Sequence, residues 1–402
     1  MSGLKVVIVA DDLTGALDVA GPFANRGHAT WVVVDHRQVD PAQFADARVL
    51  SVNATSRHLP PALAQALVRE TVERLCPPRT PILIKKIDST LRGNVAAETL
   101  AALQASGRRN AIVIPAFPAQ GRTVAGAMVH VQGVPLPQTA FARDALSPPP
   151  LEPLDAVFRG ALPDARVQAV PPGGPFDLSG GAGPLRVYVV DSATDEDLRT
   201  TVTALGAGLD RCVLVGSAGI AGAVARVSMR DAPHEPLPPV ENGVLIVVGS
   251  RAEQSAAQVD MLTRGADVAV FPAPNGALRD DRAIQVDTHP VAVLRAVAGE
   301  AGAVADAASV ARALAQNAAR ALGARRIDAL VATGGDTAIA VLNALGVAAL
   351  RVMGDLLPGI PYARLDVRGK PLWLVTKAGG FGTPGALCEV VARLRAGSAG
   401  RP

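Results

Sequence analysis

The strongest constraint on the fold is a repeated alternation of short apolar runs with helical segments. The first run, Lys5–Ala10, reads KVVIVA, and a helical pattern over about Thr14–Arg26 follows it. Continuous Val, Ile and Leu runs between helices are typical of parallel strands that are covered on both faces. Further strands are expected at Ala29–Val34, Arg48–Val52, Pro81–Ile87, Asn110–Ile114, Arg186–Val190 and Cys212–Val215, with helices at Pro61–Leu75 and Asn94–Ala105. The pattern predicts a doubly wound α/β fold.

A proline-rich, polar segment, Arg230–Val240 (RDAPHEPLPPV), interrupts this alternation. Such composition is typical of a linker between domains. The alternation then resumes, with strands expected at Val244–Val248, Val268–Phe271, Ile327–Thr333 and Leu372–Thr376, and helices at Ala252–Thr263, Ala303–Leu322, Thr337–Leu345 and Gly385–Arg395. We therefore expect two doubly wound α/β domains with mainly parallel sheets: residues 1–232, a linker at 233–241, and residues 242–402.

The alternation weakens between Pro115 and Pro184, where proline and glycine are dense. This composition predicts loops or an excursion over the surface. A solvated insertion and a substrate-facing loop are both compatible with it.

Charge and cysteine content exclude several classes of protein. The 39 Lys and Arg residues nearly balance 36 Asp and Glu residues, and no basic run of five occurs, so we expect no nucleic-acid partner. No 18-residue apolar run is free of Gly, Pro and charge, and no signal peptide precedes the first strand, so we expect a cytoplasmic protein without membrane spans. The three cysteines form no C-x-x-C pair, which argues against a zinc site. We expect no metal-binding cluster of protein side chains.

Polar side chains directly follow the first strand and the Pro81–Ile87 strand. Asp11 and Asp12 are adjacent carboxylates: one can cap the next helix, and the other can accept hydrogen bonds from a hydroxylated ligand or hold a metal. The alternative is that both are caps or solvated turn residues. In doubly wound sheets ligands bind at the carboxyl ends of the strands, so this position favours a site.

The segment KKIDSTLRGN (Lys85–Asn94) gathers Lys86, Asp88, Ser89 and Arg92 at one strand end. Lysine and arginine suit a carboxylate or phosphate, and Asp and Ser suit sugar hydroxyls. An ordinary capped helix entry with a surface salt bridge is the alternative. Arg57 follows the third strand and is a candidate second anion clamp.

Three glycine-rich turns follow strands in the second half. They are Gly249-Ser250, the turn Gly334-Gly335-Asp336-Thr337, and Lys377–Gly382 with Gly379 and Gly380. Glycine allows close backbone approach, and free N–H groups in a helix's first turn bind phosphate oxygens. Tight turns with Asp336 or Thr337 as N-cap are the alternative. Lys377 is expected either to neutralise phosphate charge or to lie at the surface.

No P-loop motif and no protein-kinase motif set is present. Gly380, Gly382 and Gly385 fit G-x-G-x-x-G, the dinucleotide fingerprint. That match lies too near the end of the sequence for the rest of a βαβ unit to follow.

Seven segments, taken in order, resemble the four-carbon acid sugar kinase family. They are ADDLTGALD (Ala10–Asp18), KKIDSTLRGN (Lys85–Asn94), PAFPAQGRTVAGA (Pro115–Ala127), VGSAGIA (Val215–Ala221), VVGS (Val247–Ser250), GGDTA (Gly334–Ala338) and KAGGFG (Lys377–Gly382). The resemblance implies a sugar-acid-binding N-terminal domain, a nucleotide-binding C-terminal domain and a site in the cleft between them. It also implies ATP-dependent phosphorylation of the terminal hydroxyl of threonate, erythronate or 3-oxo-tetronate.

By position, the resemblance places Asp12, Arg57 and the Lys86–Ser89 segment in the substrate pocket. It places Ser250, the Gly334–Thr337 turn and the glycines around Gly379 at ATP. We expect in-line transfer in which Mg²⁺ bridges the ATP phosphates and Lys86 and Arg92 stabilise the transferring group. Arg57 would clamp the substrate carboxylate, and either Asp12 or Asp336 would orient or deprotonate the hydroxyl.

Three alternative functions stay open at this point. They are an NAD(P)-dependent oxidoreductase of sugar acids, a non-catalytic sugar-acid-binding protein, and a kinase for another acid such as a glycerate. The oligomeric state also stays open, with a homodimer as one alternative.

Overall fold

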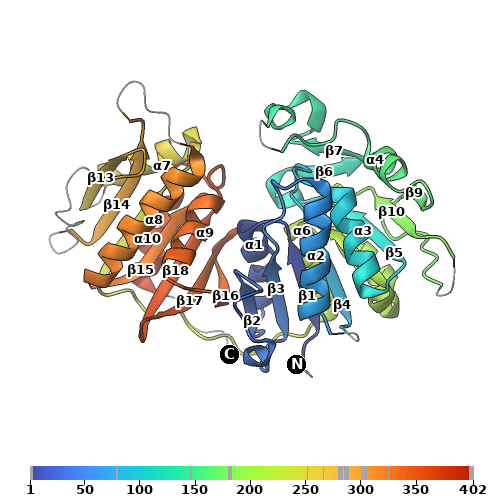
Figure 1. The fold of residues 1–402 in the computed structure, drawn as a ribbon, viewed down its shortest axis with the longest axis horizontal. Helices are drawn as coiled ribbons and strands as arrows, with labels where there is room; N and C mark the ends of the chain where they lie inside the picture. Colours follow the sequence, from blue (N-terminus) through green and yellow to red (C-terminus); the bar gives the residue numbers. More distant parts are fainter. Residues whose placement is uncertain are drawn as a thin grey trace. The chain divides into compact units, whose positions relative to one another are not determined.

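The structure of the chain is a computed structural model. It describes residues 3–77, 80–144, 147–179, 183–250, 252–265, 267–278, 284, 289–299, 306–324 and 326–397. The chain forms two compact units, Met1–Asp231 (unit 1) and Ala232–Pro402 (unit 2). Figure 1 shows that each unit is a sheet covered by helices.

Unit 1 contains a wholly parallel sheet among its described residues. Its spatial order is β2-β3-β1-β4-β11-β5-β10-β9. The strands are β1 (Val6–Ala10), β2 (Thr30–Val33), β3 (Val49–Asn53), β4 (Ile82–Lys86), β5 (Asn110–Ile114), β9 (Arg166–Val170), β10 (Arg186–Val190) and β11 (Cys212–Gly216). Strands β1, β3, β4, β5 and β11 are buried along their whole length, which is the reason that they read as continuous apolar runs.

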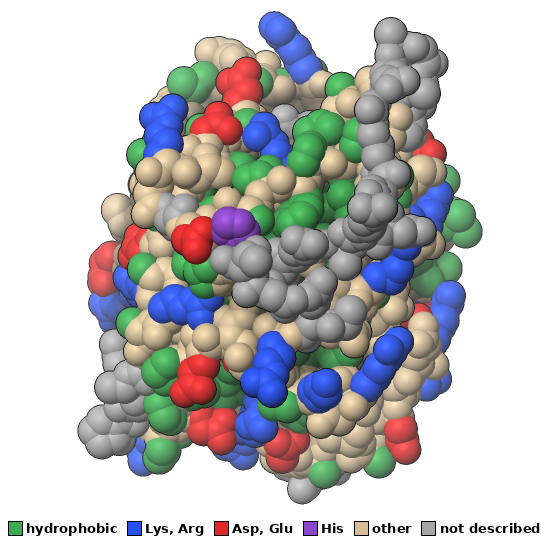
Figure 2. All heavy atoms as spheres, turned by 90° about the vertical axis from the view of Figure 1, so that its left-hand side faces the viewer, with side chains coloured by type: hydrophobic (Ala, Val, Ile, Leu, Met, Phe, Trp, Pro, Cys, Tyr) green, Lys and Arg blue, Asp and Glu red, His purple; other side chains and the backbone are tan. Residues whose placement is uncertain are grey.

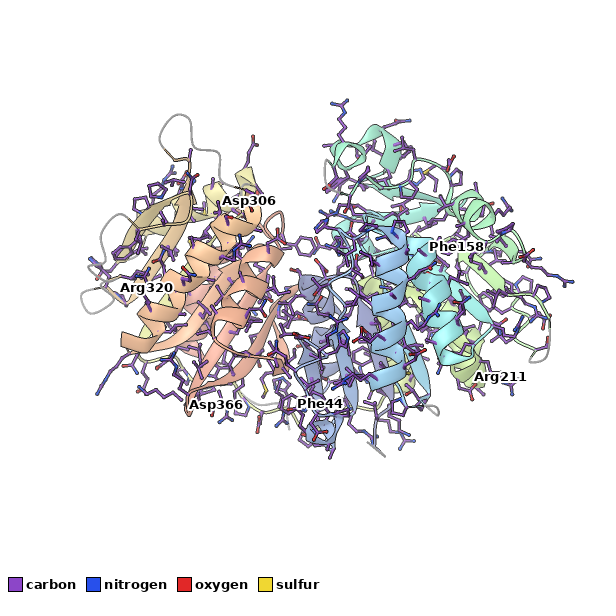
Figure 3. All side chains as sticks on the ribbon, viewed as in Figure 1. Phe44, Phe158, Arg211, Asp306, Arg320 and Asp366 are labelled. Carbon is purple, nitrogen blue, oxygen red and sulfur yellow. The ribbon has the colours of Figure 1, made fainter. Side chains whose placement is uncertain are left out.

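Two groups of helices cover this sheet. Helices α1, α5 and α6 pack together, and α2, α3 and α4 form a second group (Figure 1). Their bounds are α1 (Leu13–Ala24), α2 (Pro61–Leu75), α3 (Val95–Ser106), α4 (Leu154–Ala161), α5 (Asp195–Leu205) and α6 (Ala218–Ser228), and two short 3₁₀ helices are η1 (Pro41–Phe44) and η5 (Gly206–Arg211). Phe44 of η1 and Phe158 of α4, labelled in Figure 3, are fully buried and anchor these elements to the unit.

The segment between β5 and α4 is more ordered than its composition predicts. It forms a small antiparallel sheet of β6 (Arg122–Ala125), β7 (Met128–Val131) and β8 (Val134–Pro135). Three 3₁₀ helices accompany it: η2 (Pro118–Gln120), η3 (Leu136–Gln138) and η4 (Ala140–Arg143). Val124 exchanges backbone hydrogen bonds with Ser192, just after β10, which ties this sheet to the unit.

Unit 2 contains a mixed sheet. Strands β13, β14, β12, β15 and β18 run parallel in that order, and β17 and β16 continue it antiparallel. The bounds are β12 (Gly243–Val248), β13 (Val268–Pro274), β14 (Val291–Val297), β15 (Ile327–Thr333), β16 (Ala349–Leu357), β17 (Ile360–Val367) and β18 (Lys370–Lys377). The mainly parallel character is confirmed, and the antiparallel strands at one edge are an addition to it.

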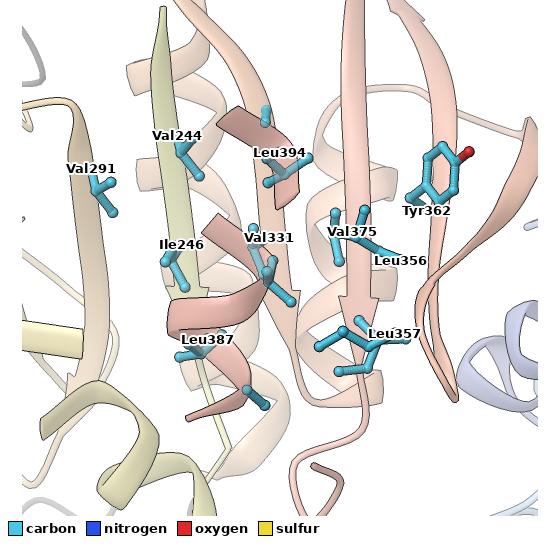
Figure 4. Close-up of a cluster of buried hydrophobic side chains, with 14 of the residues drawn as sticks. Val244, Ile246, Val291, Val331, Leu356, Leu357, Tyr362, Val375, Leu387 and Leu394 are labelled. Atoms are coloured by element: carbon cyan, nitrogen blue, oxygen red, sulfur yellow. The ribbon is translucent and has the colours of Figure 1, made fainter. Parts of the chain in front are cut away.

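The core of unit 2 lies between this sheet and helices α7 and α10. Figure 4 shows Val244 and Ile246 of β12 and Val331 of β15 beside Leu387 and Leu394 of α10, all fully buried. Helices α8 and α9 pack together as a separate pair. The bounds are α7 (Glu253–Gly265), α8 (Ala307–Ala324), α9 (Gly335–Ala344) and α10 (Ala386–Ala396). Residues 303–305 of the helix expected at Ala303–Leu322 lie outside the described residues.

The proline-rich segment before β12 has no regular secondary structure, but it is attached to unit 2. Leu237 and Val240 are almost completely buried in the unit 2 core, and His234 contacts the Met353 carbonyl at 2.7 Å. Two buried apolar residues and the His234 contact therefore attach to unit 2 a segment whose composition predicts a solvated linker.

The described helices include none that is long and apolar enough to cross a membrane. On the face shown in Figure 2, acidic and basic side chains are interspersed. Such mixing gives little electrostatic support for a nucleic-acid interface on that face.

Candidate functional site

In unit 1, three neighbouring strands end at the same level. Ala10 of β1 pairs with Asn53 of β3 on one side and with Lys86 of β4 on the other. The polar residues that follow these strands therefore meet at one edge of the sheet, as expected for the carboxyl ends of parallel strands.

Arg57 is held by two carboxylates that follow β1. Its Nε and Nη2 donate to the Asp11 carboxylate at 2.8 and 2.9 Å, and its Nη1 donates to Asp12 at 2.5 Å. Arg57 is 9% exposed and Asp11 only 2%. Burial acts to raise the pKa of Asp11, but the charge and hydrogen bond of Arg57 outweigh it and hold that pKa below its ordinary value. The predicted anion clamp is thus already bound to carboxylates of the protein.

Asp12 has two structural partners. Its Oδ1 accepts a hydrogen bond from the Gly15 N–H at 2.7 Å and so caps α1, while its Oδ2 pairs with Arg57. Asp12 is therefore the capping carboxylate, and Asp11 is the one turned into the protein. A Cβ at Gly15 would lie 2.6 Å from Asp12 Oδ1 and 3.0 Å from Lys86 Nζ, so only glycine allows this close approach.

Asp88 and Arg92 form a second charged pair just after β4. Arg92 Nε and Nη2 donate to the two oxygens of Asp88 at 2.9 and 3.0 Å. Burial would raise the pKa of Asp88, but Arg57 and Arg92 lower it well below its usual range. Ser89 lies half-buried between them and makes no side-chain hydrogen bond to a described residue.

The two lysines of β4 differ in their contacts. Lys86 is 4% exposed and its Nζ donates to the Ile87 carbonyl at 3.0 Å, but it forms no ion pair with a described carboxylate. Lys85 is fully buried and its Nζ lies 2.7 Å from Glu98 Oε2. Lys86 is therefore a cation beside Asp12 whose charge the protein does not pair directly.

Asp18 is a candidate site residue that the sequence analysis does not predict. It lies on α1, one turn beyond Gly15, and is half-buried. Burial raises the pKa of Asp18 to about 6, against the charge of Lys86 and with a contribution from the charges of Asp12 and Asp88. The i, i+3 spacing of Gly15 and Asp18 puts them on one helix face, and that spacing was the available signal.

The excursion after β5 also reaches this edge, because Ile114 of β5 and Lys86 of β4 both align with Gly216 of β11. Ser147 Oγ donates to the Arg57 carbonyl at 3.2 Å, and Asp144 lies 3.6 Å from Arg92. Of the two interpretations left open for this segment, these contacts favour the substrate-facing one.

In unit 2, three strand ends are also level. Val248 of β12 aligns with Thr333 of β15, and Thr333 aligns with Lys377 of β18. The three glycine-rich turns therefore share one edge of the sheet. They carry the predicted residues Ser250, Gly334, Gly335, Asp336, Thr337, Gly379 and Gly380.

Lys377 holds the last of these turns together from within. It is 1% exposed, which excludes a surface position, and its Nζ donates to the carbonyls of Ala378, Gly379 and Phe381 at 2.9, 3.2 and 3.0 Å. Burial lowers the pKa of Lys377 to about 8. Three side chains of α7 also donate hydrogen bonds to carbonyls of residues 379–383. They are those of Gln254, Ser255 and Gln258.

The carbonyls of this turn face donors inside the protein, whereas several of its N–H groups have no partner. The N–H groups of Gly379 and Gly380, and those of Gly335 and Asp336 in the first turn of α9, donate to no acceptor among the described residues. A Cβ at Gly379 would lie 2.0 Å from Ser250 Oγ, so the turn packs directly on Ser250. Unpaired N–H groups in such turns are a binding arrangement for phosphate.

The G-x-G-x-x-G match at Gly380, Gly382 and Gly385 does not lie within the βαβ unit that a dinucleotide-binding fold requires. The turn leads into α10, and no strand follows α10 within the described residues, which end at 397. The described residues also contain no group of three or more His, Cys, Asp or Glu that could hold a metal ion.

Two family models match the chain, one in each unit. The model of a sugar-binding N-terminal domain matches residues 6–224, and the model of a nucleotide-binding C-terminal domain matches residues 245–387. Each match contains the edge of one sheet at which the predicted polar residues or glycines gather.

The chain is also similar to characterised proteins along its whole length. It is 35% identical to the D-threonate kinase of Bordetella bronchiseptica, with 98% of each chain covered. It is 27% identical to the 3-oxo-tetronate kinase of Brucella melitensis, with 94% of this chain and 93% of the relative covered. The crystal structure of a Haemophilus influenzae protein has the same fold, at 18% identity and a TM-score of 0.72, with 96% of this chain and all of that chain covered.

These matches define a two-domain α/β protein with a sugar-binding and a nucleotide-binding domain. The chain belongs to the four-carbon acid sugar kinase family, and the predicted resemblance is confirmed.

Proposed function

We propose that the protein is an ATP-dependent kinase that phosphorylates the terminal hydroxyl of a four-carbon acid sugar. Full-length similarity to a D-threonate kinase is the observation that carries this proposal, and it makes D-threonate the first acceptor to test. Erythronate and the 3-oxo-tetronates remain acceptors of the same class, because a full-length relative is named for the latter.

The glycine-rich edge of unit 2 is the proposed ATP site. The unpaired N–H groups of Gly335, Asp336, Gly379 and Gly380 would bind phosphate oxygens, with Ser250 beside them. Mg²⁺, when bound, would neutralise charge on the ATP phosphates. It usually takes only one or two carboxylates from the protein in kinase sites, so the donor set here, with Asp336 in the first turn of α9, fits it.

The charged edge of unit 1 is the proposed acceptor site. Lys86 and Ser89 keep polar atoms that the protein does not engage in ion pairs, so they can contact the acid sugar or the transferring phosphoryl group. Arg57 would act by positioning Asp11 and Asp12 rather than by clamping the substrate. Arg92, fixed by Asp88, would contribute positive charge during in-line transfer.

Three carboxylates are candidates to orient or deprotonate the acceptor hydroxyl. Asp12 and Asp336 are the predicted ones, and Asp18 joins them because its carboxylate forms no ion pair with a described residue. In-line transfer requires the acceptor hydroxyl and the γ-phosphoryl group to meet, so the proposed acceptor edge and ATP edge would have to serve one reaction.

An ADP-release screen tests the function directly. The panel is D- and L-threonate, D- and L-erythronate and the 3-oxo-tetronates with Mg·ATP, and phosphorus NMR then locates the phosphate. We expect ADP release with at least one member and a 4-phosphate product. Binding of tetronates without any ADP release would instead indicate a non-catalytic binding protein, and binding of NADH but not ATP would indicate an oxidoreductase. Light scattering of the purified protein tests whether it is a homodimer.

A further inference from the structure

Arg122 is an arginine of unit 1 that the proposed reaction has not yet used. It begins β6, in the excursion that reaches the acceptor edge. Its Nη1 donates to the Gln120 carbonyl, and its Nε is buried without a hydrogen-bond partner among the described residues. A buried guanidinium N–H without an acceptor costs free energy, so such a group marks a position where an acceptor from outside would be favourable.

The arginines around Asp88 differ in how their charges are paired. Arg57 donates to Asp11 and Asp12 with three nitrogen atoms, and Arg92 binds both oxygens of Asp88. Arg122 forms no ion pair with any described carboxylate. Among these three arginines, Arg122 is therefore the one whose charge a negatively charged ligand could neutralise.

Phe141 and the charges nearby fix the position of this guanidinium. Its central carbon lies 5.7 Å from the centre of the Phe141 ring, a cation–π distance. Nη1 is engaged by the Gln120 carbonyl, and no described residue accepts a hydrogen bond from Nη2. Burial lowers the pKa of Arg122, the charge of Asp88 opposes that shift, and the charge of Arg92 adds to it. Arg122 is therefore within electrostatic reach of the Asp88–Arg92 pair.

The same 3₁₀ helix connects Arg122 with that pair. Phe141 lies within η4, and Asp144, which directly follows η4, is 3.6 Å from Arg92 Nη1. Residues 141–144 thus contact both arginines, so Arg122 lies on the excursion side of the acceptor edge.

We propose that Arg122 binds the carboxylate of the acid sugar and so selects acids over neutral sugars. The inference rests on the proposed function, because it assigns the acid group of that substrate to one residue. A planar guanidinium can bind a carboxylate through two parallel hydrogen bonds, and here Nη2 and a neighbouring nitrogen of Arg122 would donate them. The acceptor hydroxyl at the other end of the molecule would then be directed away from Arg122.

The test compares Arg122→Met with a matched control, Arg143→Met. Arg143 belongs to η4 in the same excursion and is exposed, so its loss removes the same charge without removing the proposed contact. Kinetics are measured with the best tetronate and with the four-carbon polyol that lacks the carboxylate, and calorimetry gives the tetronate Kd without ATP. We expect Arg122→Met to raise the tetronate KM and Kd roughly 10- to 100-fold, as for the loss of a charge-assisted hydrogen bond.

Selectivity distinguishes a substrate contact from a structural role. The turnover of the polyol and the KM for ATP should stay within twofold in Arg122→Met, and Arg143→Met should match the wild type with both acceptors. Arg122→Lys keeps the charge but loses the fork, so its tetronate KM should lie between those of the wild type and Arg122→Met. It also provides a second variant should Arg122→Met fold poorly.

Each negative result has a separate meaning. An unchanged tetronate Kd in Arg122→Met, or an equal loss with the polyol, would overturn the assignment of Arg122 while leaving the kinase intact. Tetronate binding to the wild type without ADP release would overturn the proposed function, while the Kd values would still test Arg122. Absence of both binding and turnover would overturn both.

Discussion

The two units present their candidate sites at the same kind of place, the level carboxyl ends of three neighbouring strands, but build them from different groups. The edge of unit 1 is made of charged side chains that fix one another: Arg57 with Asp11 and Asp12, and Arg92 with Asp88. The edge of unit 2 is made of backbone, with carbonyls held inward and several N–H groups that have no acceptor among the described residues. A small acid with several hydroxyls needs individually placed donors and acceptors, whereas phosphate oxygens are satisfied by an array of N–H groups.

This difference predicts how each edge fails. A network of buried charges should lose both stability and function when one member is removed, because its partners are left uncompensated. A backbone turn should lose ligand affinity with smaller losses of stability, because its N–H groups can still be solvated.

Arg57→Met gives the largest expected effect. The substitution leaves the almost fully buried Asp11 carboxylate without its cation, and removal of one partner from a buried ion pair costs about 3–5 kcal/mol. We expect a melting temperature lower by roughly 10 °C for unit 1, in proportion to its size, and little tetronate turnover. Calorimetric melting curves and ADP release measure the two effects.

Arg37→Met is the matched control for this loss. Arg37 pairs with Glu70 at an exposed position, where solvent screens the charges, so loss of this pair should change the melting temperature little. Equal melting temperatures for Arg57→Met and Arg37→Met would show that the unit 1 network is not the structural element described above.

The sequence predicts the positions of both edges better than their internal contacts. The strands Asn110–Ile114 and Ile327–Thr333 were predicted with the bounds that the structure shows, because buried parallel strands are uninterrupted apolar runs. The antiparallel strands β16 and β17 were missed, since charged residues such as Asp355 and Arg364 interrupt their apolar pattern. Sequence periodicity does not reveal a strand that alternates between a buried and an exposed face as readily as one buried on both.

Side-chain pairing is the part that sequence alone could not provide. Arg57 was expected to face a ligand, but its partners lie more than forty residues earlier in the chain and reach it only through the register of β1 and β3. Lys377 was expected at a phosphate or at the surface, and instead closes the turn that follows it. In both cases a cation in a candidate functional motif binds protein groups and holds them in position, a role that depends on tertiary contacts.

Lys377→Met tests the backbone edge and should have an intermediate effect. It removes the ammonium from three carbonyls, so the 378–381 turn loses the arrangement that exposes its N–H groups. We expect the KM for ATP to rise roughly 10- to 100-fold, within the range for lost hydrogen bonds to a charged group, while the tetronate Kd is unchanged. A rise in the tetronate Kd of the same size would contradict the separation of the two edges.

The pH dependence of the wild type sharpens this test. The pKa of Lys377 is lowered to about 8, so its ammonium is lost between about pH 7 and 9 and the KM for ATP should rise over that range. Above pH 8 the unfolded chain binds more protons at this lysine than the folded chain, so its contribution to the stability of unit 2 increases with pH. A rise in KM without a fall in melting temperature therefore distinguishes a change in the turn from unfolding, and Lys377→Arg, which stays charged, should show no such rise.

Asp18→Asn should have the smallest effect on stability, and an effect of opposite sign to that of Arg57→Met. Because the pKa of Asp18 is raised to about 6, the protonated group favours the folded state at low pH, and this contribution is lost as the pH rises from about 4 to 6. Asparagine cannot ionise, so the variant does not lose this contribution as the pH rises. The stability of the variant minus that of the wild type should therefore be roughly 1–2 kcal/mol larger at pH 7.5 than at pH 4, a value reduced because the group is half-buried. Denaturant unfolding at the two pH values measures the difference.

The same variant also tests a role in the reaction. If Asp18 is kept at the acceptor edge for the reaction, the variant should lose turnover, because charges that destabilise the fold are often retained for function. Full activity of the variant would exclude Asp18 from the reaction. A variant that is less stable than the wild type at pH 7.5 would show that the Asp18 charge does not destabilise the folded protein.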